Sequence, residues 1–179
     1  YLVGIEEMVK GAIKQARKTS SDFDPMQIIG IGIDTTGSSP MPVDKNGTPL
    51  AFSPDFKENL NAMVWLWKDH SSYAESALIT ELAQKMRPQY LAKIGGTYSS
   101  EWFWSKILHC KKVAAEVFHA AHNFVEICDY IPALLAGDTR PEKVLHSVCA
   151  AGHKAMYNDS WEGLPDKEFL SALDPELGN

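Results

Sequence analysis

Apolar residues recur every three or four positions in several stretches of the chain, the pattern that predicts amphipathic helices. The first stretch begins at Leu2 and ends near Arg17, before a Ser-, Asp- and Pro-containing break at 21–25. Gly137 suits the end of a later helix, and Asp166 suits the start of the last one. Further helices are predicted over residues 72–86, 101–109 (capped by Ser99 or Ser100), 111–122, 131–136 and 164–173.

Continuous apolar runs predict buried strands between these helices. Residues 27–34 read Gln-Ile-Ile-Gly-Ile-Gly-Ile-Asp, which is typical of a strand buried on both faces of an α/β sheet. The Asn46-Gly47 pair predicts a hairpin turn, and Pro42 and Pro49 favour an edge position for it. Together the elements predict one compact α/β unit. Further strands are predicted at 62–67, 124–129 and 145–150.

Three polar segments follow apolar runs, at residues 34–39, 68–70 and 152–154. Because the carboxyl ends of parallel strands lie on one side of a sheet, we expect these segments to converge on one crevice. The crevice would offer carboxylates, hydroxyls, a lysine and indole rings. This mixture suits a polyhydroxylated ligand, since hydroxyls need directional hydrogen bonds and an aromatic face covers apolar C–H groups.

The same residues also have plain structural explanations. Asp34 is equally well explained as a cap of the turn that follows it, and Lys154 as a solvated surface lysine. No P-loop or GxSxG spacing occurs in the sequence. The pattern alone therefore indicates an α/β domain with a polar-ligand cleft. The spacing of the tryptophans is typical of aromatic residues in a protein core. We therefore expect a core position for most of the four, Trp65, Trp67, Trp102 and Trp104.

The composition of the chain argues against nucleic acid, a membrane or a metal ion as its binding partner. The net charge of −6, without a long basic run, disfavours a nucleic-acid partner, and no apolar run is long enough to predict a membrane span. His119 and His122 lie three residues apart, but no CxxC or HExxH spacing supports a metal site, so none is predicted. The cysteine pattern suits reduced thiols in a cytoplasmic protein, with wide spacing between Cys110, Cys128 and Cys149.

Four stretches resemble the bacterial ribulokinases, a group within the FGGY carbohydrate kinases. They include Trp-Lys-Asp-His at 67–70 and Gly-His-Lys at 152–154, and the likeness is most specific around residues 98–109. The Trp-Lys-Asp-His form separates the chain from glycerol and xylulose kinases. The full stretches are residues 31–40, 61–70, 94–109 and 149–154.

The resemblance implies part of an α/β domain with a ribonuclease H-like fold of the actin/hexokinase superfamily, which has a central mixed sheet and flanking helices. In such a protein two domains close over a cleft. It also implies transfer of the ATP γ-phosphate to L-ribulose with Mg²⁺, giving L-ribulose 5-phosphate in arabinose catabolism. No catalytic residue and no metal ligand is expected within the chain. The substrate-binding residues carried over from the resemblance are Asp34, Thr35, Thr36, Gly37, Trp67, Asp69, Tyr98, Glu101 and Lys154.

Residues 1–179 are expected to form part of the N-terminal, sugar-binding domain of such a kinase. A phosphate-binding hairpin is expected before residue 1, and the catalytic Asp segment and the ATP domain beyond residue 179. We therefore expect the isolated chain to be inactive, to bind neither ATP nor Mg²⁺, and to self-associate through an exposed sheet edge. The alternatives are an FGGY kinase for another pentulose or polyol, or a non-catalytic sugar-binding module.

Overall fold

The structure, a computed structural model, describes residues 1–178, and for His153 it describes the backbone only. The chain forms two units, Tyr1–Ile33 and Asp34–Asn179, so the prediction of one compact unit is wrong. Within residues 1–178 no helix combines the length and apolar character needed to cross a membrane.

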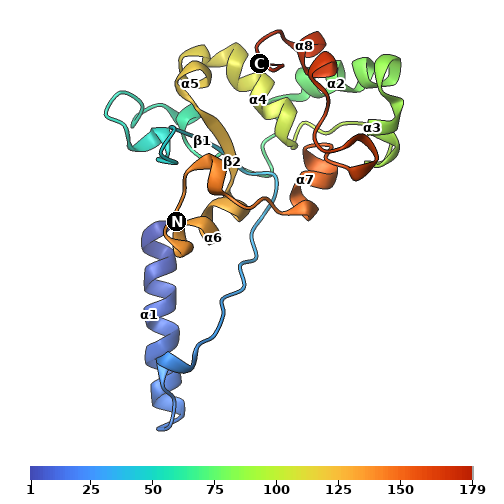
Figure 1. Ribbon diagram of the computed structural model, residues 1–179. Coiled ribbons are helices and arrows are strands. Elements are labelled where there is room, and N and C mark those ends of the chain that lie inside the picture. The colour runs from blue at the N-terminus through green and yellow to red at the C-terminus, as the bar shows by residue number, and fades with distance from the viewer. Residues whose placement is uncertain (179) are drawn as a thin grey trace. The chain divides into compact units, whose positions relative to one another are not determined.

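The first unit consists of one long helix and an extended segment (Figure 1). The helix α1 (Leu2–Thr19) has the predicted position and ends with Arg17 and Lys18 in its last turn, where cations suit the helix dipole. A short 3₁₀ turn, Pro25–Gln27, follows and is capped by the carboxylate of Asp24. None of the residues of α1 is buried.

The strand predicted at residues 27–34 is absent from the described structure. After the 3₁₀ turn the backbone is irregular, and the side chains of Ile29 and Ile31 are 101% and 61% exposed. A strand needs a neighbouring strand to receive its backbone hydrogen bonds, and no described segment pairs with this one. The apolar run therefore remains without a sheet.

The second unit contains a small sheet of two antiparallel strands, β1 (Pro40–Val43) and β2 (Asn123–Glu126) (Figure 1). Pro40 lies opposite Glu126, so the end of β2 meets the start of β1. The predicted turn at Asn46-Gly47 is confirmed, because the N–H of Gly47 donates to the carbonyl of Asp44 at 3.0 Å. Gly47 has a positive φ of 77°, which favours glycine.

The strands predicted at 62–67 and 145–150 are wrong. The first segment follows a 3₁₀ turn, Leu60–Ala62, and contacts the sheet through one bond, from Trp65 N–H to the Pro40 carbonyl at 2.9 Å. The second runs into helix α7 (Val148–Lys154), because the hydroxyl of Ser147 caps that helix. A short apolar run fits either a strand or a helix, and local capping decides here.

The remaining helices agree better with the sequence pattern. Gly137 ends α6 in the left-handed conformation, as predicted, and Asp166 caps α8 through the N–H of Phe169. The predicted serine cap of α4 is wrong, because its N-cap residue is Trp102. The elements are α2 (Tyr73–Met86), α3 (Pro88–Ala92), α4 (Phe103–Val113), α5 (Ala115–Ala120), α6 (Ile127–Ala136) and α8 (Lys167–Leu173).

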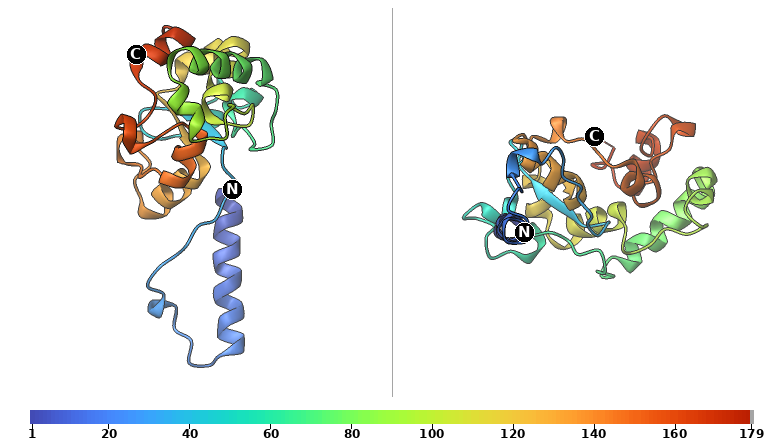
Figure 2. Two further views of the ribbon diagram at one scale, coloured as in Figure 1. Left: turned by 90° about the vertical axis from the view of Figure 1, so that its right-hand side faces the viewer. Right: turned by 90° about the horizontal axis from the view of Figure 1, so that it is seen from below.

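Helix α4 separates two groups of buried side chains. Trp104 belongs to the group formed with α2, α3 and α8, which lie side by side (Figure 2). Ile107 and Cys110 belong to the group formed with α5 and β2. Trp65 is also buried, so two of the four tryptophans have the core role that their spacing allowed.

The described residues are thus mostly helical, with one two-stranded antiparallel sheet. The predicted central mixed sheet is not found among residues 1–178. This arrangement is compatible with a part of a larger α/β domain.

Candidate functional site

The loop at residues 34–39 changes from exposed to buried along its length. Asp34 and Thr36 are exposed, and Thr35 is half-buried with its hydroxyl 3.4 Å from the Thr36 carbonyl. Ser38 and Ser39 are buried at the start of β1. The hydroxyl of Thr36 lies 3.4 Å from that of Ser39. The loop therefore presents its first residues to solvent and fixes its last two in the protein.

Lys154, the last residue of α7, contacts this loop directly. Its ammonium group donates a hydrogen bond to the backbone carbonyl of Gly37. A Cβ atom at position 37 would lie 3.5 Å from Cδ and Cε of the lysine, so the side chain lies along the glycine. Two of the three polar segments predicted to converge, 34–39 and 152–154, thus meet.

A buried lysine that the sequence analysis missed connects the third segment. Lys106, on α4, is 1% exposed and donates to the Ser38 carbonyl at 2.8 Å and the Leu66 carbonyl at 2.6 Å. Ser38 lies in the first loop, and Leu66 directly precedes Trp67. The available signal was its position between Trp104 and Ile107, two apolar residues of the same helix.

Burial lowers the pKa of Lys106 to about 8. The carboxylates of Glu126, Asp69 and Glu101 oppose this shift, and the charge of Lys154 adds to it. Asp69, Glu101 and Lys154 are predicted site residues, and they act on Lys106 from three different segments. Lys106 therefore interacts electrostatically with three of the predicted site residues.

Glu126, at the end of β2, binds the same loop from the sheet. Its carboxylate accepts hydrogen bonds from the Ser38 hydroxyl and, at 2.6 Å, from the Ser39 N–H. Burial raises its pKa, although these two bonds and the charge of Lys106 work in the opposite direction. Glu126 was also missed by the sequence analysis, because it lies within the run at 124–129 that read as an ordinary strand.

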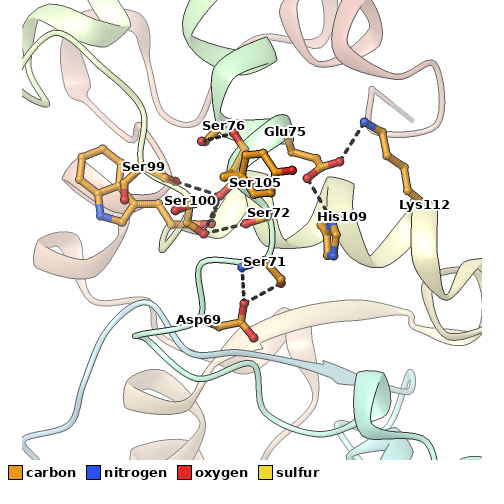
Figure 3. Close-up of polar contacts among 12 residues, drawn as sticks. Asp69, Ser71, Ser72, Glu75, Ser76, Ser99, Ser100, Ser105, His109 and Lys112 are labelled. Carbon is orange, nitrogen blue, oxygen red and sulfur yellow. Dashed lines mark hydrogen bonds and ion pairs between the residues drawn. The ribbon is translucent and has the colours of Figure 1, made fainter.

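The segment at 67–71 combines an exposed ring with a fixed carboxylate. Trp67 is 43% exposed. Asp69 is half-buried and accepts from the N–H of Ser71 at 2.7 Å and from its hydroxyl at 2.6 Å (Figure 3). Burial alone would raise the pKa of Asp69, but the hydrogen bonds from Ser71 and the charge of Lys106 lower it below its ordinary value. Asp69 is therefore held as a carboxylate.

Serine hydroxyls join the start of α2 to the loop before α4 (Figure 3). Ser72 donates to the Ser100 carbonyl at 2.7 Å, and Ser105 donates to the Ser99 carbonyl at 2.9 Å. These bonds hold the segment that carries Asp69 against α4. Glu101 follows Ser100 and lies 3.2 Å from His70 Nε2.

A buried carboxylate lies behind these hydroxyls. Glu75, on α2, has a side chain that is 5% exposed, and its oxygens lie 3.0 Å from His109 Nδ1 and 3.0 Å from Lys112 Nζ (Figure 3). Both partners are on α4. The carboxylate therefore ties α2 to α4 from within the protein, and it contacts none of the predicted site residues by a hydrogen bond.

Tyr98 lies apart from the exposed groups. It is 3% exposed, its hydroxyl accepts from the N–H of Trp104 at 3.0 Å, and it donates to the Lys154 carbonyl. Burial raises its pKa well above the ordinary value, so the hydroxyl stays protonated. Tyr98 connects the start of α4 to the end of α7 and positions Lys154.

Asp129 holds the other end of α7. Its carboxylate accepts from the Ser147 N–H at 2.8 Å and lies 3.0 Å from His146 Nδ1. The hydrogen bond to Asp129 raises the pKa of His146, although burial acts against this. Both ends of α7 are thus fixed by buried polar groups, which places Lys154 relative to the sheet.

A separate cavity of about 650 Å³ lies among α4, α5, β2 and α7. Its lining is largely apolar, and it shares Glu126 with the loop contacts described above. It is therefore distinct from the polar crevice predicted from the sequence. Among the side chains that the structure describes, no group of three or more His, Cys, Asp or Glu is arranged to hold a metal ion.

The chain is similar to curated ribulokinases. It is 45% identical over 178 residues to the ribulokinase of Vibrio parahaemolyticus, which is 99% of this chain and 31% of that protein. It is 38% identical over 157 residues to the Shouchella clausii ribulokinase, covering 88% of this chain and 27% of that protein. For the Bacillus licheniformis ribulokinase the identity is 32% over 179 residues, or 30% of that protein.

No family model matches the chain. The chain spans between 27% and 31% of the length of these curated relatives. The resemblance predicted from the sequence is therefore confirmed: over nearly its whole length this chain is similar to the ribulokinases, and it corresponds to about 30% of such a protein.

Proposed function

We propose that this chain is the sugar-binding part of an ATP-dependent carbohydrate kinase that phosphorylates L-ribulose to L-ribulose 5-phosphate. The observation that carries the proposal is the meeting of three polar segments around Lys106 and Lys154, in a chain similar to ribulokinases. The exposed groups in these segments have the hydroxyl, carboxylate and ammonium chemistry that recognises a sugar.

The exposed residues of the three segments take complementary roles in this proposal. Lys154 uses one of its three donors on Gly37, which leaves two for sugar oxygens. The carboxylate of Asp69 accepts from a sugar hydroxyl, and the half-exposed ring of Trp67 covers the C–H face. Further acceptors and donors come from Asp34, Thr35, Thr36 and Glu101. Tyr98 positions Lys154 by donating a hydrogen bond to its carbonyl.

The parts that handle ATP are proposed to lie outside residues 1–179. In this view the chain is part of an N-terminal domain with a ribonuclease H-like fold, and the phosphate-binding hairpin, the catalytic Asp and the ATP domain belong to the rest of the protein. ATP and Mg²⁺ bind there. Since phosphoryl transfer depends on positioning the phosphates, the isolated chain is expected to be inactive, and the whole protein to act in the cytoplasm.

The exposed apolar run at 28–33 fits this proposal. In the whole protein it would be a strand of the central sheet. In the isolated chain, unpaired backbone groups beside exposed isoleucines favour pairing with another copy. We expect the isolated chain to self-associate with rising concentration, as measured by sedimentation velocity. A monomer at all concentrations would contradict this part of the proposal.

The proposal is tested by measuring ADP release from the full-length protein that contains this chain, with L-ribulose and a panel of other pentuloses and polyols. Activity with L-ribulose is the expected result. Activity confined to another sugar would keep the carbohydrate kinase and reject the substrate. No activity with any sugar would favour a non-catalytic sugar-binding module.

A further inference from the structure

Lys106 is placed unusually for a lysine. Its ammonium group lies inside the protein, 1% exposed, and hydrogen-bonds two backbone carbonyls that are 28 positions apart in the sequence, those of Ser38 and Leu66. The Ser38 carbonyl belongs to the loop at 34–39, and the Leu66 carbonyl directly precedes the segment at 67–71; both segments carry proposed sugar contacts. One side chain therefore fixes the distance between these two segments.

Glu126 completes the arrangement from the opposite element. Lys106 binds the carbonyl of Ser38, whereas Glu126 binds the hydroxyl of Ser38 and the N–H of Ser39. The lysine comes from α4 and the carboxylate from β2. Two buried side chains of opposite charge thus bind Ser38 and Ser39 through three polar groups, namely one carbonyl, one hydroxyl and one backbone N–H.

Stability alone gives no reason for this pair. Removing an ammonium and a carboxylate from water is costly, and apolar side chains of similar volume are often as stable in the same place. The same bonds, however, fix the loop directly after Gly37, the residue whose carbonyl accepts from Lys154. The lowered pKa of Lys106 agrees with the cost of its burial.

We infer that Lys106, together with Glu126, is a positioning residue for the sugar site: it holds the Ser38 loop and the Trp67 segment at the separation that L-ribulose requires. This inference rests on the proposed function. Lys106 does not contact the sugar, since its hydrogen bonds are directed to the two carbonyls inside the protein. Its substitution should therefore weaken the binding of sugar and spare that of ATP.

The test uses the full-length protein with three substitutions on α4. Lys106→Met keeps the volume and removes the donors, and Lys106→Arg keeps a cation with a different geometry. Lys112→Met is the matched control, because it removes a lysine of the same helix that contacts Glu75 and neither loop. The KM for L-ribulose, the KM for ATP and kcat are measured for each, with the unfolding midpoint.

We expect Lys106→Met to raise the KM for L-ribulose about tenfold or more and the KM for ATP less than about twofold. Lys106→Arg should give a smaller rise, and Lys112→Met should leave both KM values unchanged even if it lowers stability. An unchanged sugar KM in Lys106→Met, or equal rises in both KM values, would overturn the inference. If Lys106→Met does not fold, Lys106→Arg decides by the same criterion.

Amide hydrogen exchange separates this inference from the proposed function. In Lys106→Met, the amides of residues 38–39 and 66–69 should exchange faster than in the wild type, and those of Lys112→Met should not. If the wild type phosphorylates no sugar, the proposed function fails, and the exchange data still decide whether Lys106 holds the two segments. Unchanged exchange there would overturn the positioning role.

Discussion

The ammonium of Lys154 donates to the backbone carbonyl of Gly37, joining the end of α7 to the loop that leads into β1. The two residues are far apart in the sequence, and helix α7 reaches the loop because both of its ends are fixed. Tyr98 binds the Lys154 carbonyl at one end, and Asp129 binds the Ser147 N–H at the other. The position of Lys154 thus depends on two buried residues, Tyr98 and Asp129.

Tyr98→Phe should destabilise the second unit by about 1–3 kcal/mol, because it leaves the Trp104 N–H and the Lys154 carbonyl without a buried partner. Urea denaturation of the chain measures the change. Tyr73→Phe is the control, since the side chain of Tyr73 is 73% exposed and its loss of a hydroxyl should cost less than about 0.5 kcal/mol. Equal effects of the two substitutions would contradict the role given to Tyr98.

Two glycines with nearly equal backbone angles should respond differently to alanine. Gly47 has φ 77° and Gly137 has φ 85°, so both substitutions strain the backbone, by about 1 kcal/mol. At position 47 the added Cβ would also overlap the carbonyl oxygen of Thr139, whereas at position 137 the space is open. We expect Gly47→Ala to cost at least about 1 kcal/mol more than Gly137→Ala in thermal or urea unfolding. Equal costs would mean that the turn at 47 can move away from Thr139.

Asp166→Ala should destabilise the chain by about 1–2 kcal/mol, because Asp166 caps α8 and accepts from Arg87 and Tyr90. Asp55→Ala, at an exposed position, is the control and should have little effect. Hydrogen bonding from Arg87 lowers the pKa of Asp166 to about 2. The stabilisation by the Asp166 carboxylate is therefore present above the unfolded pKa of 3.8 and is lost as the pH falls towards 2. The free energies of unfolding of Asp166→Ala and Asp55→Ala should therefore converge near pH 2.

The buried ammonium of Lys106 should give an unusual pH dependence of stability. Its folded pKa is about 8, below the ordinary value of 10.5, so between these two values the unfolded chain binds more protons. The free energy of unfolding should therefore rise with pH over this window, relative to Lys106→Met, by at least about 1 kcal/mol. Burial causes the lowered pKa; the carboxylates of Glu126, Asp69 and Glu101 oppose it, and the charge of Lys154 adds to it. Urea titrations at pH 7.5 and 10 measure this change for the wild type and Lys106→Met. An equal change in the free energy of unfolding of the two proteins would show that Lys106 keeps its ordinary pKa.

The sequence predicted local elements best where one residue decides the outcome. Gly137 ends α6 and Gly47 forms its turn as expected, because a positive φ is available mainly to glycine. Asp166 caps α8 because its carboxylate reaches a backbone N–H three residues on. Strands were predicted poorly. The apolar run at 28–33 has the composition of a buried strand, but a strand exists only where a partner pairs with it.

The candidate site was predicted in its exposed parts and missed in its buried ones. Gly37, Asp69 and Lys154 lie close to the polar centre, since polar residues after apolar runs mark surface segments. Lys106 and Glu126 escaped notice, because a charged residue within a helix or strand normally faces solvent and only tertiary structure shows that it is buried. Sequence patterns therefore predict exposed polar groups more readily than the buried groups that hold them in place.

The most direct test of the central claim is the kcat/KM for L-ribulose of the full-length protein, compared between the wild type, Lys154→Ala and the control Lys167→Ala at an exposed position of α8. If the three segments form the sugar site, Lys154→Ala should lower kcat/KM about a hundredfold or more, a loss of about 2.7 kcal/mol, and Lys167→Ala should leave it unchanged. A Lys154→Ala variant as active as the wild type on L-ribulose would contradict the account.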